Sequence, residues 1–150
     1  TLTAQRTAAA SALASSFLSK KNSKTLLMVG TGALAPELIR AHASVRPIDT
    51  VYIWGRDLEK AKAVSSFITA HLQNSENAKF DIFPIENIEE GIEKADIISC
   101  ATLSSTPLIF GKKLNLQAGS CAFKPVIPPT LSVFNTTMAK IIQPAIAIKI

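Results

Sequence analysis

The stretch Thr25-Leu-Leu-Met-Val-Gly-Thr-Gly-Ala-Leu-Ala35 decides the fold of this 150-residue chain. Its first five residues form a short apolar run between polar Lys24 and a glycine, as in a strand that is buried on both faces. Gly30 and Gly32 follow, and a helical pattern of leucine and isoleucine begins directly after them. The stretch therefore predicts a strand, a tight turn and a helix in direct succession.

Strands and helices continue to alternate along the chain. Short apolar runs predict strands over 50–54, 80–83 and 96–100, and helical periodicity predicts helices up to about 44, over 58–72 and over 88–94. Asp57 and Asn87 stand directly before two of these helices, where their side chains can cap free N–H groups. The alternation predicts an α/β fold of the Rossmann type, a doubly wound, mainly parallel sheet with helices on both faces.

The start of the chain predicts one more helix, over 2–19. This segment is rich in alanine, and Leu2, Ala9, Leu13 and Phe17 recur at helical spacing. We place the domain over 1–125, with this helix included.

The end of the chain, 126–150, is predicted to be a separate tail. Its prolines argue against a continuous helix. Ile146, Ile148 and Ile150 alternate with other residues and predict an edge strand. Nothing in the tail indicates a function.

The glycine turn has the form GxGxxA. In dinucleotide-binding folds the first glycine permits the tight turn and the second lets the backbone approach a pyrophosphate. Free N–H groups at the start of the following helix attract the phosphates. A glycine turn without a ligand is the alternative, and the strand before and the helix after it make that alternative weaker. The predicted cofactor contacts in this turn are Gly30, Thr31, Gly32, Ala33 and Leu34.

The end of the second strand bears on which dinucleotide is bound. NAD-binding folds usually place an acidic residue there, to accept hydrogen bonds from the ribose. Here the strand ends Trp54-Gly55-Arg56, and Asp57 comes later and has a competing role as a helix cap. A solvated Arg56 is the alternative, but a guanidinium suits a 2′-phosphate. We therefore predict that these three residues contact the cofactor and that NADP(H) is preferred over NAD(H).

The segment after the fourth strand completes the predicted cofactor site. Ala101, Thr102 and Ser104 follow that strand, at the edge where open α/β sheets bind ligands. Their hydroxyl groups could meet the ribose or the nicotinamide side of the cofactor. An ordinary loop rich in serine and threonine is the alternative.

Composition argues against several other classes of function. The net charge is +5, but the only tight basic group is Lys20, Lys21 and Lys24, without interleaved aromatic residues, so we expect no nucleic-acid partner. No apolar run reaches the about 18 residues of a membrane span, and no signal peptide is evident, so we expect a cytoplasmic protein. The two cysteines and two histidines lack metal-ligand spacing, and no metal site is predicted.

Catalytic residues are not identified by any pattern. His42 and His71 fall in predicted helices without a partner carboxylate at an interpretable spacing. Each is interpreted as a surface or packed helix residue. No nucleophile-elbow pattern is present either.

The first residues, Thr1-Leu-Thr-Ala-Gln-Arg-Thr-Ala-Ala-Ala-Ser-Ala-Leu-Ala14, resemble the LTAxRTAAASALA helix of the ornithine cyclodeaminase/mu-crystallin family. The resemblance extends from residue 1 to about 120. Further motifs follow in that family's order: the glycine turn, Val45-Arg-Pro-Ile48, Trp54-Gly-Arg56, Ala95-Asp-Ile-Ile98 and Ala101-Thr102 through Pro107-Leu108.

The resemblance implies roles that spacing does not. Arg6 would bind the carboxylate of the substrate, and Thr7 would contact the cofactor phosphates. Family members convert ornithine to proline, reduce cyclic ketimines such as pyrroline-2-carboxylate, dehydrogenate amino acids, or serve as thyroid-hormone-binding crystallins. The Trp-Gly-Arg ending is more similar to the NADPH-using ketimine reductases than to the NAD-using cyclodeaminases.

The resemblance also implies a substrate domain with a catalytic lysine and contacts of a homodimer, and residues 1–150 show no match to it. The segment Gly119–Pro125 is similar to a family strand but shorter. We therefore expect the NAD(P)-binding part of a ketimine reductase or ornithine cyclodeaminase acting on a small amino or imino acid. The alternative is a non-enzymatic, crystallin-like protein that binds NADPH.

Overall fold

A computed structural model describes residues 2–71, 80–104, 108–109, 121–122 and 145–148. Its strands form one sheet in the order β3-β2-β1-β4-β6-β5. The first four pair in parallel, whereas β6 pairs antiparallel with both β4 and β5. The bounds are Thr25–Val29 for β1, Thr50–Trp54 for β2, Asp81–Ile85 for β3, Ile97–Cys100 for β4, Cys121–Ala122 for β5 and Ala145–Ile148 for β6.

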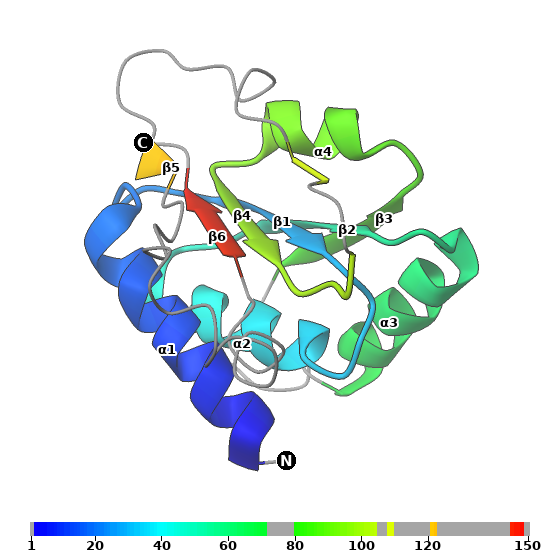
Figure 1. The fold of residues 1–150 in the computed structure, drawn as a ribbon, viewed down its shortest axis with the longest axis horizontal. Helices are drawn as coiled ribbons and strands as arrows, with labels where there is room; N and C mark the ends of the chain where they lie inside the picture. Colours follow the sequence, from blue (N-terminus) through cyan, green and yellow to red (C-terminus); the bar gives the residue numbers. More distant parts are fainter. Residues whose placement is uncertain (1, 72–79, 105–107, 110–120, 123–144, 149–150) are drawn as a thin grey trace, which may run out of the picture.

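Helices cover both faces of this sheet (Figure 1). Helices α1, α2 and α3 lie on one side and the short α4 lies on the other. This arrangement confirms the predicted Rossmann-type α/β fold. The bounds are Leu2–Leu18 for α1, Ala35–Val45 for α2, Leu58–His71 for α3 and Ile88–Lys94 for α4.

Strand β1 lies at the centre of the core. Leu26 and Met28 pack into the hydrophobic cluster on the side of α2 and α3, whereas Leu27 and Val29 pack into the cluster on the side of α4. All four side chains are completely buried. This two-sided burial explains why the sequence of β1 is continuously apolar.

Short polar side chains begin two of the helices, as predicted. Asp57 Oδ1 accepts a hydrogen bond from the Glu59 backbone N–H at 3.0 Å, at the start of α3. Asn87 Oδ1 accepts one from the Glu89 N–H at 2.9 Å, at the start of α4. Strand β3 ends two residues later than predicted and includes Pro84, because it lies at the edge of the sheet, where a missing N–H is tolerated.

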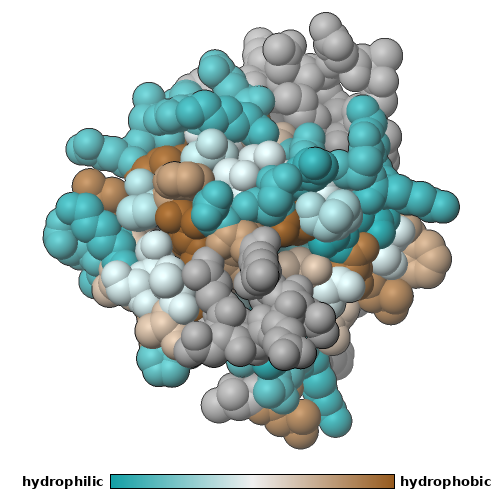
Figure 2. Space-filling view, turned by 180° about the vertical axis from the view of Figure 1, so that it is seen from behind, coloured by the Kyte–Doolittle hydropathy of each residue, from teal (hydrophilic) through white to brown (hydrophobic). Residues whose placement is uncertain are grey.

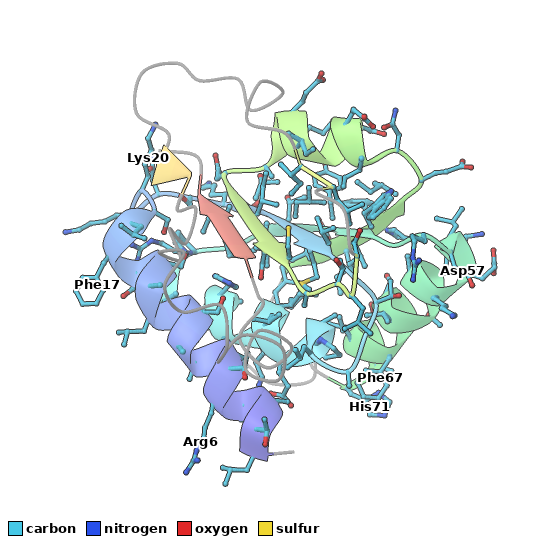
Figure 3. The ribbon with its side chains drawn as sticks, viewed as in Figure 1. Arg6, Phe17, Lys20, Asp57, Phe67 and His71 are labelled. Atoms are coloured by element: carbon cyan, nitrogen blue, oxygen red, sulfur yellow. The ribbon has the colours of Figure 1, made fainter. Side chains whose placement is uncertain are left out.

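Helix α1 buries its small residues and exposes its large ones. The buried residues of the helix are Ala4, Ala8, Ser11, Ala12 and Ser15, and the helix packs against α2. The side chains whose spacing predicted the helix point outward instead, as Figure 3 shows for Phe17.

Seen from behind, hydrophobic residues on the surface of the molecule form separate patches between hydrophilic ones (Figure 2).

Arg46 ties the end of α1 to the end of α2. Its guanidinium donates to the Ser16 carbonyl at 2.6 Å, to the Ser19 carbonyl at 3.0 Å and to Ser19 Oγ at 2.8 Å. A cation at this position also suits the partial negative charge of a helix C-terminus. Arg46, in the segment Val45–Ile48 that resembles the family, therefore has a structural role.

Both histidines are helix residues, as interpreted from the sequence. His42 is completely buried between α2 and α1, and its Nε2 lies 3.2 Å from Ser11 Oγ. Burial lowers the pKa of His42 to about 4, so the ring is neutral at physiological pH. His71 is exposed at the end of α3 and stacks on Phe67, with 4.4 Å between ring centroids (Figure 3).

The tail contributes a strand in a place that the sequence did not predict. Strand β6 was expected at an edge, but it lies between β4 and β5. The prediction was wrong because the two residues of β5 pair along its other side. Ile150 lies outside the described residues, and the boundary at 125 stays a prediction because 123–144 are not described.

Candidate dinucleotide site

The carboxyl ends of β1, β2 and β4 meet at one edge of the sheet. Val29, the last residue of β1, pairs with Trp54 on one side and with Cys100 on the other. The segments that follow these three strands are therefore neighbours. This register brings together the three groups of predicted cofactor contacts, which begin at Gly30, Trp54 and Ala101.

Gly30 is required by the fold itself. Its backbone has φ +123°, a conformation that residues with a side chain rarely adopt. A Cβ atom there would collide with the carbonyl oxygen of Ala101. The Gly30 N–H donates to the Trp54 carbonyl at 2.8 Å, and the Ala101 N–H donates to the Val29 carbonyl at 2.8 Å. The turn is thus held between the ends of β2 and β4.

Gly32 lies in a different environment within the same turn. It is exposed, and a Cβ atom built on it would meet no atom of the described residues within 4 Å. Neither packing nor a positive φ requires a glycine at this position. In the predicted site, the backbone at Gly32 approaches a pyrophosphate, which would lie in this open space.

The N-terminus of α2 begins beside this open space. Its N-cap residue, Leu34, has no side-chain acceptor for the first N–H groups, and the Ala35 N–H donates to the Gly32 carbonyl at 3.0 Å. Pro36 occupies the first turn, where its missing N–H is harmless. The positive end of the helix dipole therefore faces the glycine turn without a side-chain cap.

The end of β2 presents a cation at the same edge. The Trp54 indole N–H donates to the Glu86 carbonyl at 3.0 Å, which holds the ring across the end of β3. Arg56 is exposed and forms no ion pair with any residue that the structure describes. Asp57, labelled in Figure 3, caps α3, so its carboxylate already has a structural partner.

The segment after β4 lies next to the glycine turn. Thr102 Cγ2 would be 3.4 Å from a Cβ atom on Gly30. The Thr102 hydroxyl accepts a hydrogen bond from the Ser104 N–H at 3.2 Å, and Ala101, Thr102 and Ser104 are all half-buried. The hydroxyl groups predicted to meet the cofactor therefore lie at the same edge of the sheet as the glycine turn.

Arg6 and Thr7 lie apart from this group. Arg6 is exposed, and in Figure 3 it points away from the sheet and from the segment that joins β1 to α2. The Thr7 hydroxyl donates to the Thr3 carbonyl at 3.0 Å, within α1. The described residues do not gather either side chain at the glycine turn, and the roles implied by the resemblance stay predictions.

The sequence did not predict the structural role of Asp96. Asp96 Oδ2 accepts hydrogen bonds from the backbone N–H groups of Lys24 and Thr25, at 2.8 and 3.0 Å, and so closes the opposite edge of the sheet. In the sequence, a single carboxylate directly before a buried strand could have indicated this role.

Metal and thiol chemistry have no support among the described residues. Those residues contain no cluster of histidine, cysteine, aspartate or glutamate that could hold a metal ion. Burial raises the pKa of the Cys100 thiol to about 12, so this thiol stays protonated and unreactive. No helix in the described segments is long and apolar enough to cross a membrane.

The strand order, the layers and the glycine turn define a Rossmann-type domain of the dinucleotide-binding class. Residues 1–122 match the sequence model of the Ornithine cyclodeaminase/mu-crystallin family. The chain belongs to this family, as its opening helix and later motifs predicted.

Several relatives carry reductase or cyclodeaminase names. An uncharacterised protein of Schizosaccharomyces pombe is 49% identical over 114 residues, which are 76% of this chain and 34% of that protein. A Delta(1)-pyrroline-2-carboxylate reductase of Colwellia psychrerythraea is 42% identical over 111 residues, 73% of this chain and 33% of that protein. An ornithine cyclodeaminase of Brucella suis is 31% identical over 132 residues, 82% of this chain and 35% of that protein. The chain thus spans about a third of the length of these relatives.

Solved structures show the same fold. A Delta(1)-pyrroline-2-carboxylate reductase of Thermococcus litoralis, in complex with NADH and L-proline, has a TM-score of 0.68 at 29% identity, over 75% of this chain and 33% of that chain. An iminosuccinate reductase of Paracoccus denitrificans, in complex with NAD+, has a TM-score of 0.56 at 28% identity, over 71% of this chain and 31% of that chain.

Proposed function

We propose that this chain binds NADP(H) as the cofactor-binding part of a reductase or cyclodeaminase that acts on a small amino or imino acid. The observation that carries the proposal is the open space at Gly32, inside a turn that the rest of the fold holds in place. The relatives named pyrroline-2-carboxylate reductase and ornithine cyclodeaminase support the class of reaction. The neighbours in complex with NADH and with NAD+ support a nicotinamide dinucleotide.

Three groups of residues would hold the cofactor. The backbone from Gly30 to Leu34, with the N-terminus of α2, would bind the pyrophosphate. Trp54, Gly55 and Arg56 would bind the adenosine side, and the half-buried Ala101, Thr102 and Ser104 would lie toward the nicotinamide. The nicotinamide would supply the hydride exchange, so these residues contribute position and electrostatics.

The proposed preference for NADP(H) depends on Arg56. This guanidinium is exposed and has no carboxylate partner among the described residues. The adjacent carboxylate, that of Asp57, caps the N-terminus of α3, and Glu59 forms an ion pair with Lys62. A doubly charged 2′-phosphate would therefore meet a cation and no competing anion from this turn. The substrate role of Arg6 is part of the same proposal and rests on the family resemblance alone.

Trp54 offers a direct test of cofactor binding. It is the only tryptophan of the chain and lies at the end of β2, so its fluorescence reports on the proposed site. We expect NADPH to quench this fluorescence in a saturable titration of the full chain. Fluorescence that does not change after correction for the absorbance of NADPH, together with no heat of binding, would contradict the proposal.

A second function, cofactor-supported binding without turnover, is favoured by the position of Arg6. This side chain points away from the glycine turn, so the described residues alone do not assemble a substrate site there (Figure 3). Oxidation of NADPH in the presence of pyrroline-2-carboxylate separates the two functions. Turnover by the chain supports the reductase, whereas saturable NADPH binding without turnover supports the binding protein.

A further inference from the structure

Thr31 occupies the space that a side chain at position 55 would need. A Cβ atom built on Gly55 would lie 2.6 Å from Thr31 Cγ2 and 3.3 Å from Thr31 Oγ1. Carbon atoms in van der Waals contact are about 3.5–4.0 Å apart, so the first distance is a collision. Gly55 does not have a positive φ. The contact with Thr31, and not the backbone conformation, therefore requires a glycine at position 55.

This contact joins the glycine turn to the end of β2, and a second interaction between described residues joins the same two segments. This second interaction is the hydrogen bond from the Gly30 N–H to the Trp54 carbonyl, at 2.8 Å. The two interactions act on consecutive residues of both segments, Gly30 with Thr31 and Trp54 with Gly55. Together they fix how far Arg56, the next residue, stands from the turn.

That separation matters because a dinucleotide presents two anionic groups at a fixed covalent spacing. The pyrophosphate would lie at the glycine turn, and a 2′-phosphate would lie at Arg56. Both groups can be bound at once only if the two protein segments match that spacing. Small misplacements weaken a charge-assisted contact strongly, since such contacts depend on geometry.

We propose that Thr31 is a positioning residue for the choice of cofactor: its methyl group, packed on Gly55, holds Arg56 where the 2′-phosphate binds. This inference rests on the proposed binding of NADP(H). It adds that the discrimination between NADPH and NADH depends on the fit of Thr31 to Gly55, two residues that need not touch the 2′-phosphate.

The central variants are Gly55→Ala and the double variant Gly55→Ala/Thr31→Ser. The added methyl group of Gly55→Ala collides with Thr31, so the turn and Arg56 move apart. We expect the ratio of NADPH to NADH affinity to fall by about tenfold. Thr31→Ser removes the colliding methyl group and keeps the hydroxyl, so the double variant regains most of the ratio.

If Gly55→Ala does not fold, two single variants of Thr31 still test the inference. Thr31→Ala removes the contact without any collision, and we expect the ratio to fall. Thr31→Val keeps a methyl group against Gly55 and removes the hydroxyl, and we expect the ratio to be kept. A fallen ratio in Thr31→Val would show that the hydroxyl itself selects the cofactor, and the positioning role would be overturned.

Calorimetry of the full chain with NADPH and with NADH measures these ratios, and thermal unfolding confirms that each variant folds. A lower ratio in Gly55→Ala, restored in the double variant, supports the inference. An unchanged ratio, or an equal loss of both affinities, overturns it while the proposed function stands if the unmutated chain prefers NADPH. If the unmutated chain binds neither cofactor or binds both equally, the proposed NADP(H) preference fails and the inference fails with it.

Discussion

The two edges of the parallel sheet use their polar groups differently. At the amino edge, Asp96 binds the N–H groups of Lys24 and Thr25, and the Lys24 carbonyl accepts from the Asp49 and Thr50 N–H groups at 3.0 and 3.2 Å. At the carboxyl edge, Gly32 faces open space and α2 begins without a side-chain cap. One edge is closed by the protein's own hydrogen bonds, whereas the other offers its groups to a ligand. Changes at the amino edge should therefore alter stability, and changes at the carboxyl edge should alter binding.

Gly30 lies at the carboxyl edge, but we expect its substitution to lower both stability and cofactor binding. This is the largest effect on stability that we expect. Gly30→Ala combines a strained backbone at φ +123° with a collision against the Ala101 carbonyl. We expect the free energy of unfolding to fall by about 3–4 kcal/mol, with loss of NADPH binding. Urea denaturation measures the first effect. A variant that keeps its full stability would show that the turn is not held as described.

The interface between α1 and α2 is part of neither edge of the sheet, and we expect its contribution to the free energy of unfolding to depend on pH. The pKa of the buried His42 is lowered to about 4, so the folded state disfavours the charged ring. The free energy of unfolding therefore keeps its full value above the unfolded pKa of about 6.5. It decreases as the pH falls toward 4, because the unfolded state binds the proton more readily. We expect a loss on the order of 3 kcal/mol over this range, relative to a His42→Gln variant that cannot titrate. Parallel unfolding curves of the two proteins from pH 7 to 4 would contradict this.

Variants of Asp96 test whether the amino edge of the sheet contributes to stability and not to cofactor binding. Asp96→Ala leaves two backbone N–H groups without their acceptor, and we expect a loss of about 2 kcal/mol in the free energy of unfolding. Asp96→Asn keeps one acceptor oxygen and should lose less. The affinity for NADPH should stay within about twofold in both variants. A large loss of affinity in a folded Asp96→Ala protein would break the distinction between the edges.

Arg56 tests the open edge and gives the smallest of these effects. Arg56→Ala should reduce the preference for NADPH over NADH by about tenfold, or about 1.4 kcal/mol, and leave stability unchanged. Lys60→Ala removes the same charge from the exposed surface of α3 and should keep the preference. Calorimetry at low salt is the suitable measurement, because exposed charge contacts are screened. If the unmutated chain, Arg56→Ala and Lys60→Ala prefer NADPH over NADH equally, Arg56 does not determine the preference.

The sequence predicted the parts of the fold that depend on local signals. The apolar run of β1, the caps at Asp57 and Asn87 and the glycine turn each have a short-range cause, and the structure confirms them. The motif at residues 1–14 also predicted the family correctly.

The remaining features depend on contacts between distant segments. Periodicity predicted α1, but its buried face is set by the close approach of α2, which selects Ala8 and Ser11 over Leu13 and Phe17. The place of β6 depends on pairing across the sheet. The contact of Thr31 with Gly55 depends on how two turns approach each other, and no single segment encodes that.

The central claim is that the open space at Gly32 belongs to a dinucleotide, and Gly32→Val tests it most directly. Near its Cβ the new side chain meets no atom of the part of the chain that the structure describes, so the free energy of unfolding should stay within about 1 kcal/mol of the unmutated value. The side chain would project into the space for the pyrophosphate, so NADPH affinity should fall by about a hundredfold or more. Calorimetric titration of the two proteins with NADPH, beside their urea denaturation curves, decides the matter. Unchanged affinity in the stable variant would contradict the claim.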